Sequence, residues 1–135
     1  MKFTIDKVQD WQEVVDEIFP AFQHKILLLK GNLGAGKTTF TQFLLKKFGS
    51  TDVVSSPTYA IVNEYHTPNG NVFHFDLYRM KDIDEVLDIG IEEYLESSYF
   101  CIIEWPEIYQ DELAYLGYHE MSIENDGSKR VIEFQ

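Results

Sequence analysis

The spacing of hydrophobic residues in the first part of the chain predicts a strand, a helix and a second strand. Residues 3–5 alternate like a short strand, and Asp6 can cap a helix that follows. Apolar residues recur at helical spacing over residues 8–22, which predicts one amphipathic helix with Pro20 near its end. The apolar positions of this helix are Val8, Trp11, Val14, Val15, Ile18 and Phe22. Residues 26–29 are consecutive apolar residues, as expected of a strand buried on both faces.

The middle of the chain predicts a helix and then a β-hairpin. A second helical pattern covers residues 38–48, and Gly49 is placed to end it. Alternating stretches over residues 59–66 and 71–79 flank a turn across residues 68–71. Asn and Gly in this turn are typical of a hairpin connection.

The last part of the chain predicts one more helix and three more strands. Apolar residues fall on one side of a helix over residues 84–95, so we predict a single helix there despite Gly90. Residues 100–103 form a second continuous apolar run, typical of a buried strand. Residues 119–125 and 129–135 flank a DGS turn and predict a final pair of strands.

Composition favours one globular domain over residues 1–135, since 44% hydrophobic and 15% aromatic residues can form a sizeable core. The 11 Lys and Arg against 23 Asp and Glu give a formal net charge of -12, which argues against unaided binding to RNA or DNA. The single cysteine, Cys101, cannot form an internal disulfide, and no paired Cys or His spacing indicates a zinc site. Because no long apolar run or targeting segment is present, we expect a cytoplasmic protein with no membrane segment.

The glycine-rich stretch between the second strand and the second helix predicts a phosphate-binding loop. Gly31, Gly36, Lys37 and Thr38 match the pattern GxxxxGK(S/T) in the strand-loop-helix context that this motif requires. In such a loop, backbone N–H groups and the helix N-terminus surround the phosphates. Lys37 would reach the β- and γ-phosphates, and the Thr38 hydroxyl would bind Mg²⁺. The predicted nucleotide-binding residues of the loop are Asn32, Leu33, Gly34, Ala35, Gly36, Lys37, Thr38 and Thr39.

A P-loop also needs an acidic residue for the metal, and two candidates end apolar runs. Glu104 follows the unbroken run at residues 100–103, and Asp76 follows a run that His74 interrupts. One acid could anchor Mg²⁺ while the other orients the attacking water, or one acid could simply end its strand.

Other parts of the sequence favour ATP as the nucleotide but do not determine which reaction it undergoes. The guanine-reading pattern NKxD and the pattern DxxG are both absent from the sequence, and basic residues are too few for a kinase-like lid. Pro57 stiffens the loop that carries Thr58, so this threonine could contact Mg²⁺ or the γ-phosphate, or belong to an ordinary turn. An ATPase or ATP-dependent switch is favoured, with a small phosphotransferase and a nucleotide-gated binding module as alternatives.

Together these motifs resemble the TsaE (YjeE) family of the tRNA threonylcarbamoyladenosine pathway. The resemblance rests on GNLGAGKTTF, SSPTYAIVNEY, HFDLYR, EVLDIGIEEYL and IIEWPE, in that order. It implies a single α/β P-loop NTPase domain with a mixed central β-sheet flanked by helices. It also implies Mg²⁺-dependent ATP hydrolysis in support of the TsaD transferase, together with TsaB. The acidic chain would then meet tRNA only indirectly, through these partners.

The resemblance also implies roles for individual residues. Lys37 would hold the phosphates, Thr38 and Glu104 the Mg²⁺, while Asp76 would be needed for hydrolysis and Thr58 would occupy a switch-like position.

Further residues follow from the same resemblance. Arg130 and Trp11 are expected near the adenine, and Tyr78 and Arg79 could contact a partner or orient the loops. Trp105 matches a tryptophan of the family, although a packed aromatic at a strand end accounts for it better.

Overall fold

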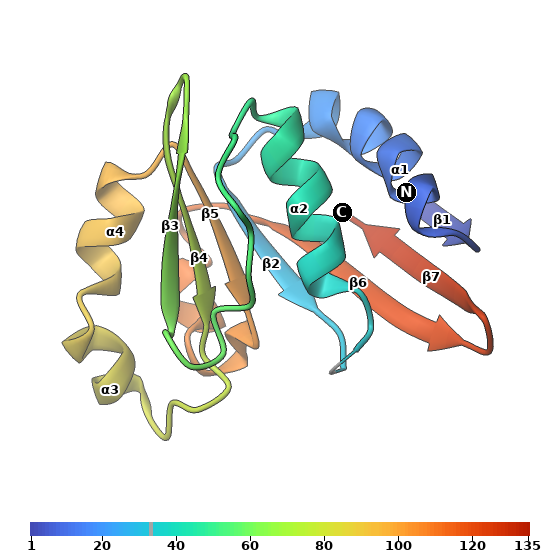
Figure 1. Ribbon diagram of the computed structural model, residues 1–135. Coiled ribbons are helices and arrows are strands. Elements are labelled where there is room, and N and C mark those ends of the chain that lie inside the picture. The colour runs from blue at the N-terminus through green and yellow to red at the C-terminus, as the bar shows by residue number, and fades with distance from the viewer. Residues whose placement is uncertain (33) are drawn as a thin grey trace.

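The computed structural model describes residues 1–32 and 34–135. Within them the strands form one seven-stranded sheet in the order β1-β7-β6-β2-β5-β4-β3 (Figure 1). The strands are β1 (Lys2–Ile5), β2 (Ile26–Lys30), β3 (Val62–Thr67), β4 (Gly70–Asp76), β5 (Phe100–Glu104), β6 (His119–Asp126) and β7 (Lys129–Phe134). The pairs β2-β5, β2-β6 and β4-β5 are parallel, whereas β1-β7, β6-β7 and β3-β4 are antiparallel. The predicted mixed sheet is therefore confirmed.

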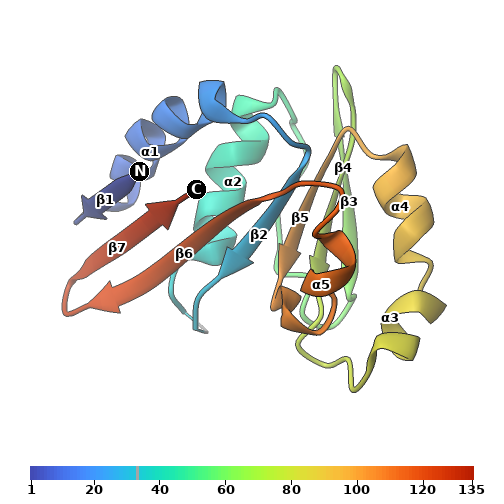
Figure 2. The same ribbon diagram turned by 180° about the vertical axis from the view of Figure 1, so that it is seen from behind.

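Helices cover both faces of this sheet. On one face lie α1 (Trp11–Ile18) and α2 (Lys37–Lys47), in front of β2, β6 and β7 in Figure 1. The other face packs against α3 (Ile83–Asp88), α4 (Ile91–Ser97) and α5 (Gln110–Leu113), the last of which is seen from behind in Figure 2. Three short 3₁₀ turns complete the described elements: η1 (Val8–Asp10), η2 (Phe19–Ala21) and η3 (Pro106–Ile108).

The central strand β2 is buried on both faces, as its unbroken apolar run predicts. Leu27 and Leu29 belong to the core beneath α1 and α2, whereas Ile26 and Leu28 belong to the core on the opposite face. Alternation of side chains along a strand produces this division. A strand anchored in two cores gives the loop that follows it a rigid base.

The predicted helix over residues 8–22 is shorter than expected. Only α1 is α-helical, with η1 before it and η2 after it, and Val8 is 62% exposed instead of packed. Asp6 caps neither turn; instead, the Asp10 carboxylate accepts hydrogen bonds from the backbone N–H groups of Asp6 and Lys7. Pro20 lies in the first turn of η2, where its missing N–H ends the α-helical hydrogen bonding.

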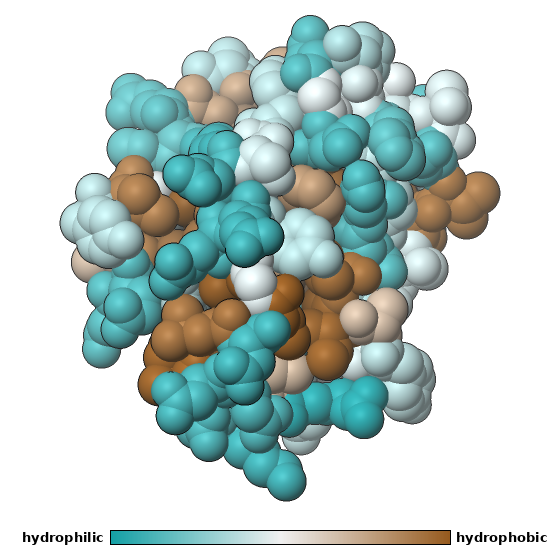
Figure 3. Space-filling view, turned by 90° about the vertical axis from the view of Figure 1, so that its left-hand side faces the viewer, coloured by the Kyte–Doolittle hydropathy of each residue, from teal (hydrophilic) through white to brown (hydrophobic). Residues whose placement is uncertain are grey.

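The predicted single helix over residues 84–95 is likewise wrong. Gly90 adopts a left-handed conformation with φ of 82°, which no α-helix can contain, and it separates α3 from α4. Leu87, expected on the apolar side, is 41% exposed. The side of the molecule on which α3 and α4 lie carries a patch of apolar side chains among polar ones (Figure 3). The helix α2 and the β6-β7 pair form where the sequence predicts them. The β3-β4 hairpin also forms, but residues 59–61 and 77–79, predicted as strand, lie outside it.

Among the helices of the described residues, none has the length and apolar character needed to cross a bilayer.

Candidate active site

The topology gathers the predicted site residues at one edge of the sheet. The strands β2, β4 and β5 are parallel, so their carboxyl ends lie together at the lower edge in Figure 1. Glu104 ends β5 and pairs in register with Asp76 at the end of β4. The glycine-rich loop leaves β2 at the same edge and leads into α2 at Lys37. Clefts at this edge are the usual ligand sites of open α/β sheets.

Close packing explains two glycines of the loop. A Cβ on Gly31 would lie 2.8 Å from the backbone oxygen of Ile123 in β6, so only glycine fits. Gly36, immediately before α2, has φ of 114°, and a Cβ there would lie 3.3 Å from the Trp11 ring. The predicted contact of Leu33 with the nucleotide lies outside the described residues.

A pocket of about 250 Å³ opens beside this loop and brings together most of the predicted site residues. Its lining consists of Gly34, Gly36, Lys37, Thr38, Thr39, Ser56, Thr58, Asp76, Glu104, Trp105 and Arg130. Asn32 and Ala35 do not line it; with β6 they border another pocket of about 350 Å³. The structure therefore groups the predicted catalytic and metal-binding side chains, while two residues of the loop face elsewhere.

Lys37 is buried at the first position of α2, with 7% of its surface exposed. Its Nζ lies 3.4 Å from Oε1 of Glu104 and 4.6 Å from the centre of the Trp105 ring. A buried cation needs such compensation, which Glu104 and Trp105 provide.

Glu104 is 3% exposed and remains ionised at neutral pH. Burial raises its pKa, but the hydrogen bond and attraction of His74, together with Lys37, outweigh burial, so the pKa lies below its ordinary value. His74 forms this hydrogen bond through Nε2 to Oε2 of Glu104. The sequence indicated His74 only as a break in an apolar run. Its signal was its position two residues before Asp76, which places both side chains on the same face of β4.

Asp76 is 4% exposed, and both of its oxygens accept hydrogen bonds. The Thr58 hydroxyl donates to Oδ2 at 3.0 Å, and the backbone N–H of Tyr78 donates to Oδ1 at 2.9 Å. The backbone N–H of Asp76 donates to the carbonyl of Ile61 at 2.8 Å. The loop that carries Thr58 is thus fastened directly to the acid at the end of β4.

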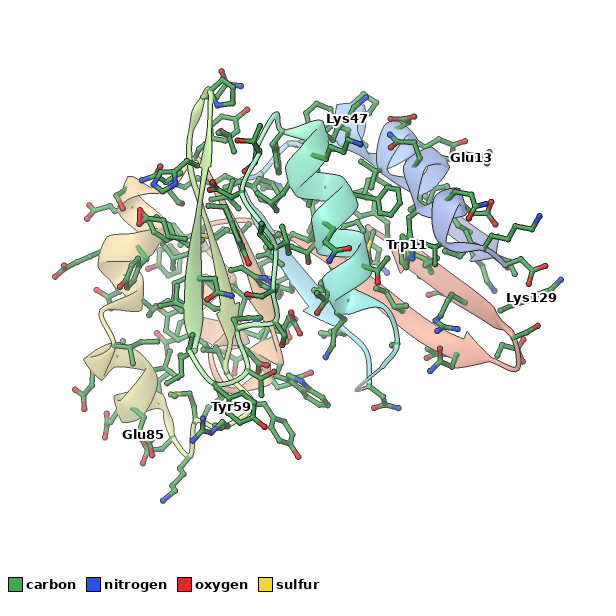
Figure 4. The ribbon with its side chains drawn as sticks, viewed as in Figure 1. Trp11, Glu13, Lys47, Tyr59, Glu85 and Lys129 are labelled. Atoms are coloured by element: carbon green, nitrogen blue, oxygen red, sulfur yellow. The ribbon has the colours of Figure 1, made fainter. Side chains whose placement is uncertain are left out.

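Arg130 and Trp11 both lie beside the glycine-rich loop, but in different ways. Arg130 lines the pocket, and its Nε donates a 2.9 Å hydrogen bond to the carbonyl of Ala35. Trp11 is only 3% exposed and packs against Phe40, with ring centres 5.5 Å apart (Figure 4). The Trp11 ring lies close to Gly36 but does not line the pocket. Arg130 is therefore the better placed of the two for contact with a ligand.

Trp105 lines the pocket, and its ring packs against a further aromatic side chain. Trp105 has a left-handed φ of 53°, and its ring centre lies 4.9 Å from that of Tyr78, which is 65% exposed. The Arg79 guanidinium lies 5.8 Å from the ring centre of Tyr59, an 87% exposed residue near the lower edge of the sheet in Figure 4. Trp105 is more than a packed strand end, since its ring also contacts the Lys37 ammonium.

The oxygen atoms at this pocket fit Mg²⁺ held jointly with a triphosphate. Within residues 1–32 and 34–135, no three His, Cys, Asp or Glu side chains are grouped as a metal cage. Thr38, Asp76 and Glu104 nevertheless line one pocket and offer only hard oxygen donors. Mg²⁺ commonly binds one or two such protein oxygens and completes its octahedron with phosphate oxygens and water.

The fold and site define a single α/β domain with a mixed seven-stranded sheet, flanking helices, and a glycine-rich loop beside two acidic strand ends. The sequence profile of the family described as "Threonylcarbamoyl adenosine biosynthesis protein TsaE" matches residues 5–132. This chain belongs to the TsaE family of tRNA threonylcarbamoyladenosine biosynthesis proteins, which confirms the resemblance found in its motifs.

Individual relatives agree with this assignment. The TsaE protein of Bacillus subtilis is 41% identical over 88 residues, which cover 65% of this chain and 54% of that protein. That of Haemophilus influenzae is 44% identical over 82 residues, covering 61% and 52% respectively. The chain thus spans about half the length of these two curated relatives. The TsaE protein of Treponema pallidum is 30% identical over 122 residues, covering 90% of this chain and 88% of that protein.

A solved structure supports the fold as well. The crystal structure of Bacillus subtilis YdiB superposes with a TM-score of 0.75 and 27% sequence identity, and the match covers 99% of this chain and 83% of that one.

Proposed function

We propose that this chain binds ATP with Mg²⁺ and hydrolyses it, as an accessory protein that acts with TsaD and TsaB in tRNA threonylcarbamoyladenosine modification. The observation that carries the proposal is the single pocket in which the GxxxxGK(S/T) loop meets Lys37, Thr58, Asp76 and Glu104. A P-loop NTPase requires this combination of a phosphate loop, a buried lysine and acids at strand ends.

The proposed binding step uses groups that are already close together. Backbone N–H groups at the start of α2 receive the phosphates, and Lys37 turns from Glu104, 3.4 Å away, toward the β- and γ-phosphates. Thr38 and Glu104 would hold Mg²⁺, which would supply positive charge beside the phosphate oxygens. Arg130 contributes a cation to the same pocket.

The proposed hydrolytic step depends on Asp76 and Thr58. Both Asp76 oxygens are now occupied, one of them by the Thr58 hydroxyl. If Thr58 moves to the γ-phosphate or to Mg²⁺, Oδ2 of Asp76 is freed to accept a hydrogen bond from the attacking water and to orient it. Thr58 would then report the presence of the γ-phosphate to its loop.

The charge of the chain fits an accessory role. A formal net charge of -12 opposes direct binding to tRNA, whereas docking on a partner that holds the RNA does not require a basic surface. Residues 1–135 would act as one domain, and the reaction would take place in the cytoplasm.

The test is a reconstituted modification reaction with TsaB and TsaD, with and without this chain. We expect the chain to allow repeated turnover and its ATPase rate to rise in the presence of the partners. Equal product with and without the chain, or transfer of the γ-phosphate to an acceptor instead of water, would contradict the proposal.

Variants of two pocket residues test whether ATP is bound and hydrolysed in this pocket. Lys37→Ala should abolish nucleotide binding, and Glu104→Ala should impair Mg²⁺-dependent nucleotide binding. Lys47→Ala is the matched control, because Lys47 lies near the opposite end of the same helix and pairs with Asp16 at 3.0 Å (Figure 4). Normal ATP hydrolysis by both site variants would show that the pocket is wrongly assigned.

A further inference from the structure

His74 is a buried polar residue for which the proposed reaction has no role so far. It lies within β4, beside Ile102 of β5 and Asn63 of β3, and is 0% exposed. Its Nε2 is hydrogen-bonded to Oε2 of Glu104. Its Nδ1 has no hydrogen-bond partner among the residues that the structure describes.

An unpaired ring nitrogen makes His74 a costly choice for a strand interior. A neutral ring that donates through Nε2 leaves the Nδ1 lone pair unsatisfied, and a cationic ring leaves an N–H unsatisfied. An apolar residue would fill this position without that cost. The histidine provides a hydrogen bond to Glu104, which an apolar residue could not make.

As a result, the two oxygens of the Glu104 carboxylate have different partners. Oε2 is held by His74, whereas Oε1 lies 3.4 Å from Lys37 Nζ, on the side of the pocket. Glu104 and Lys37 line the pocket, but His74 does not. His74 therefore cannot reach a ligand directly and can act on it only through Glu104.

We propose that His74 is a positioning residue for Glu104: its Nε2–H fixes Oε2, so that Oε1 alone is presented to Mg²⁺ or to a water bound to it. The inference rests on the proposed function, because it takes Glu104 as the residue that serves the metal. It adds a specific link between a buried strand position and the metal affinity of the site. Partners that hold a metal-binding carboxylate typically change metal affinity or activity by about 10–100-fold when they are replaced.

The experiment compares two amides at this position. In His74→Gln the side-chain amide reaches the place of Nε2 and can still donate to Glu104, whereas in His74→Asn it is one methylene shorter. The readout is binding of a fluorescent ATP analogue, titrated with Mg²⁺ and repeated in EDTA, together with thermal unfolding. His119→Gln is the control, since His119 is also buried but bonds to the backbone of Gln23 and Gln135 instead.

We expect His74→Asn to raise the Mg²⁺ concentration needed for half-maximal nucleotide binding by about 10-fold or more. His74→Gln should raise it much less, because the longer amide can still donate to Glu104. Binding in EDTA should be unchanged in both. An unchanged Mg²⁺ response in His74→Asn, or a parallel loss of EDTA binding and thermal stability in both variants, would overturn the inference. A wild-type chain whose nucleotide binding ignores Mg²⁺ would overturn the proposed function, and this inference with it.

A second measurement needs no variant at this position. The chain has only four histidines, so their ring protons can be separated by ¹⁵N-edited NMR. The Nε2 proton of His74 should exchange slowly and should shift in Glu104→Gln. Exchange as fast as in His66, whose side chain is 68% exposed, would overturn the inference.

Discussion

Replacing Asp76 by asparagine should separate an effect on the proposed hydrolysis from effects on folding and binding. The amide keeps the shape of the carboxylate, and its oxygen can still accept from the Tyr78 N–H, now at 2.9 Å. Its nitrogen would occupy the place of Oδ2 and donate to the Thr58 hydroxyl oxygen, 3.0 Å away. That hydroxyl can then donate to Ser56 Oγ at 2.8 Å. Because every hydrogen bond has a replacement, the free energy of unfolding should change by less than about 1 kcal/mol.

The catalytic effect should be far larger. An amide nitrogen cannot accept a hydrogen bond from the attacking water, so the hydrolysis rate of Asp76→Asn should fall by about 10²–10⁴-fold. This loss corresponds to about 2.7–5.4 kcal/mol in activation free energy. Nucleotide affinity should stay within the same order of magnitude, because Lys37 and the loop are untouched.

Three measurements check this prediction: single-turnover phosphate release, binding of a fluorescent nucleotide, and urea unfolding. Asp52→Asn is the control, since Asp52 also accepts a hydrogen bond from a backbone N–H, that of His66, but lies outside the pocket. A normal rate in Asp76→Asn would refute the role of this acid. Equal losses of rate, binding and stability would show that Asp76 serves the fold instead.

Other predictions follow from the loop, the core and the charge of the site. Gly36→Ala should lower the free energy of unfolding by about 1 kcal/mol more than Gly127→Ala. Both glycines have positive φ, but only a Cβ on Gly36 would meet another side chain, that of Trp11 at 3.3 Å. Equal urea midpoints for the two variants would contradict this. Burial raises the pKa of the Cys101 thiol to about 11, so labelling by a thiol reagent at pH 8 should follow unfolding, and rapid labelling of the native chain would contradict it. The lowered pKa of Glu104 means that its ionised form stabilises the fold above its unfolded pKa, near 4.5, and that this contribution disappears as pH falls through the lower folded value. An acid titration of stability should therefore be shallower in Glu104→Gln, and an unchanged curve would show that Glu104 does not contribute.

Sequence patterns identified the parts of the fold where a single physical factor dominates. The apolar run at residues 26–29 can be satisfied only by burial on both faces, and the loop motif fixes the start of α2. Helical spacing was less reliable, because it does not distinguish α from 3₁₀ turns and cannot show that Gly90 takes a left-handed φ. His74 was missed because its partner lies 30 residues away on the neighbouring strand, a contact created by sheet register.

The two halves of the site differ in how firmly they are held, and this difference suits a switch. The glycine-rich loop and α2 follow β2, which is paired on both sides and anchored in two cores. The loop that carries Thr58 lies outside the sheet and is held by a small number of hydrogen bonds, such as those of Thr58 with Asp76 and Ser55 with Tyr65. It ends at Ile61, whose φ of 70° is strained for a β-branched residue. If the proposed function holds, the phosphates would bind beside the firmly anchored strand β2 and helix α2, while hydrolysis and partner contact would respond to a loop that a few interactions can rearrange.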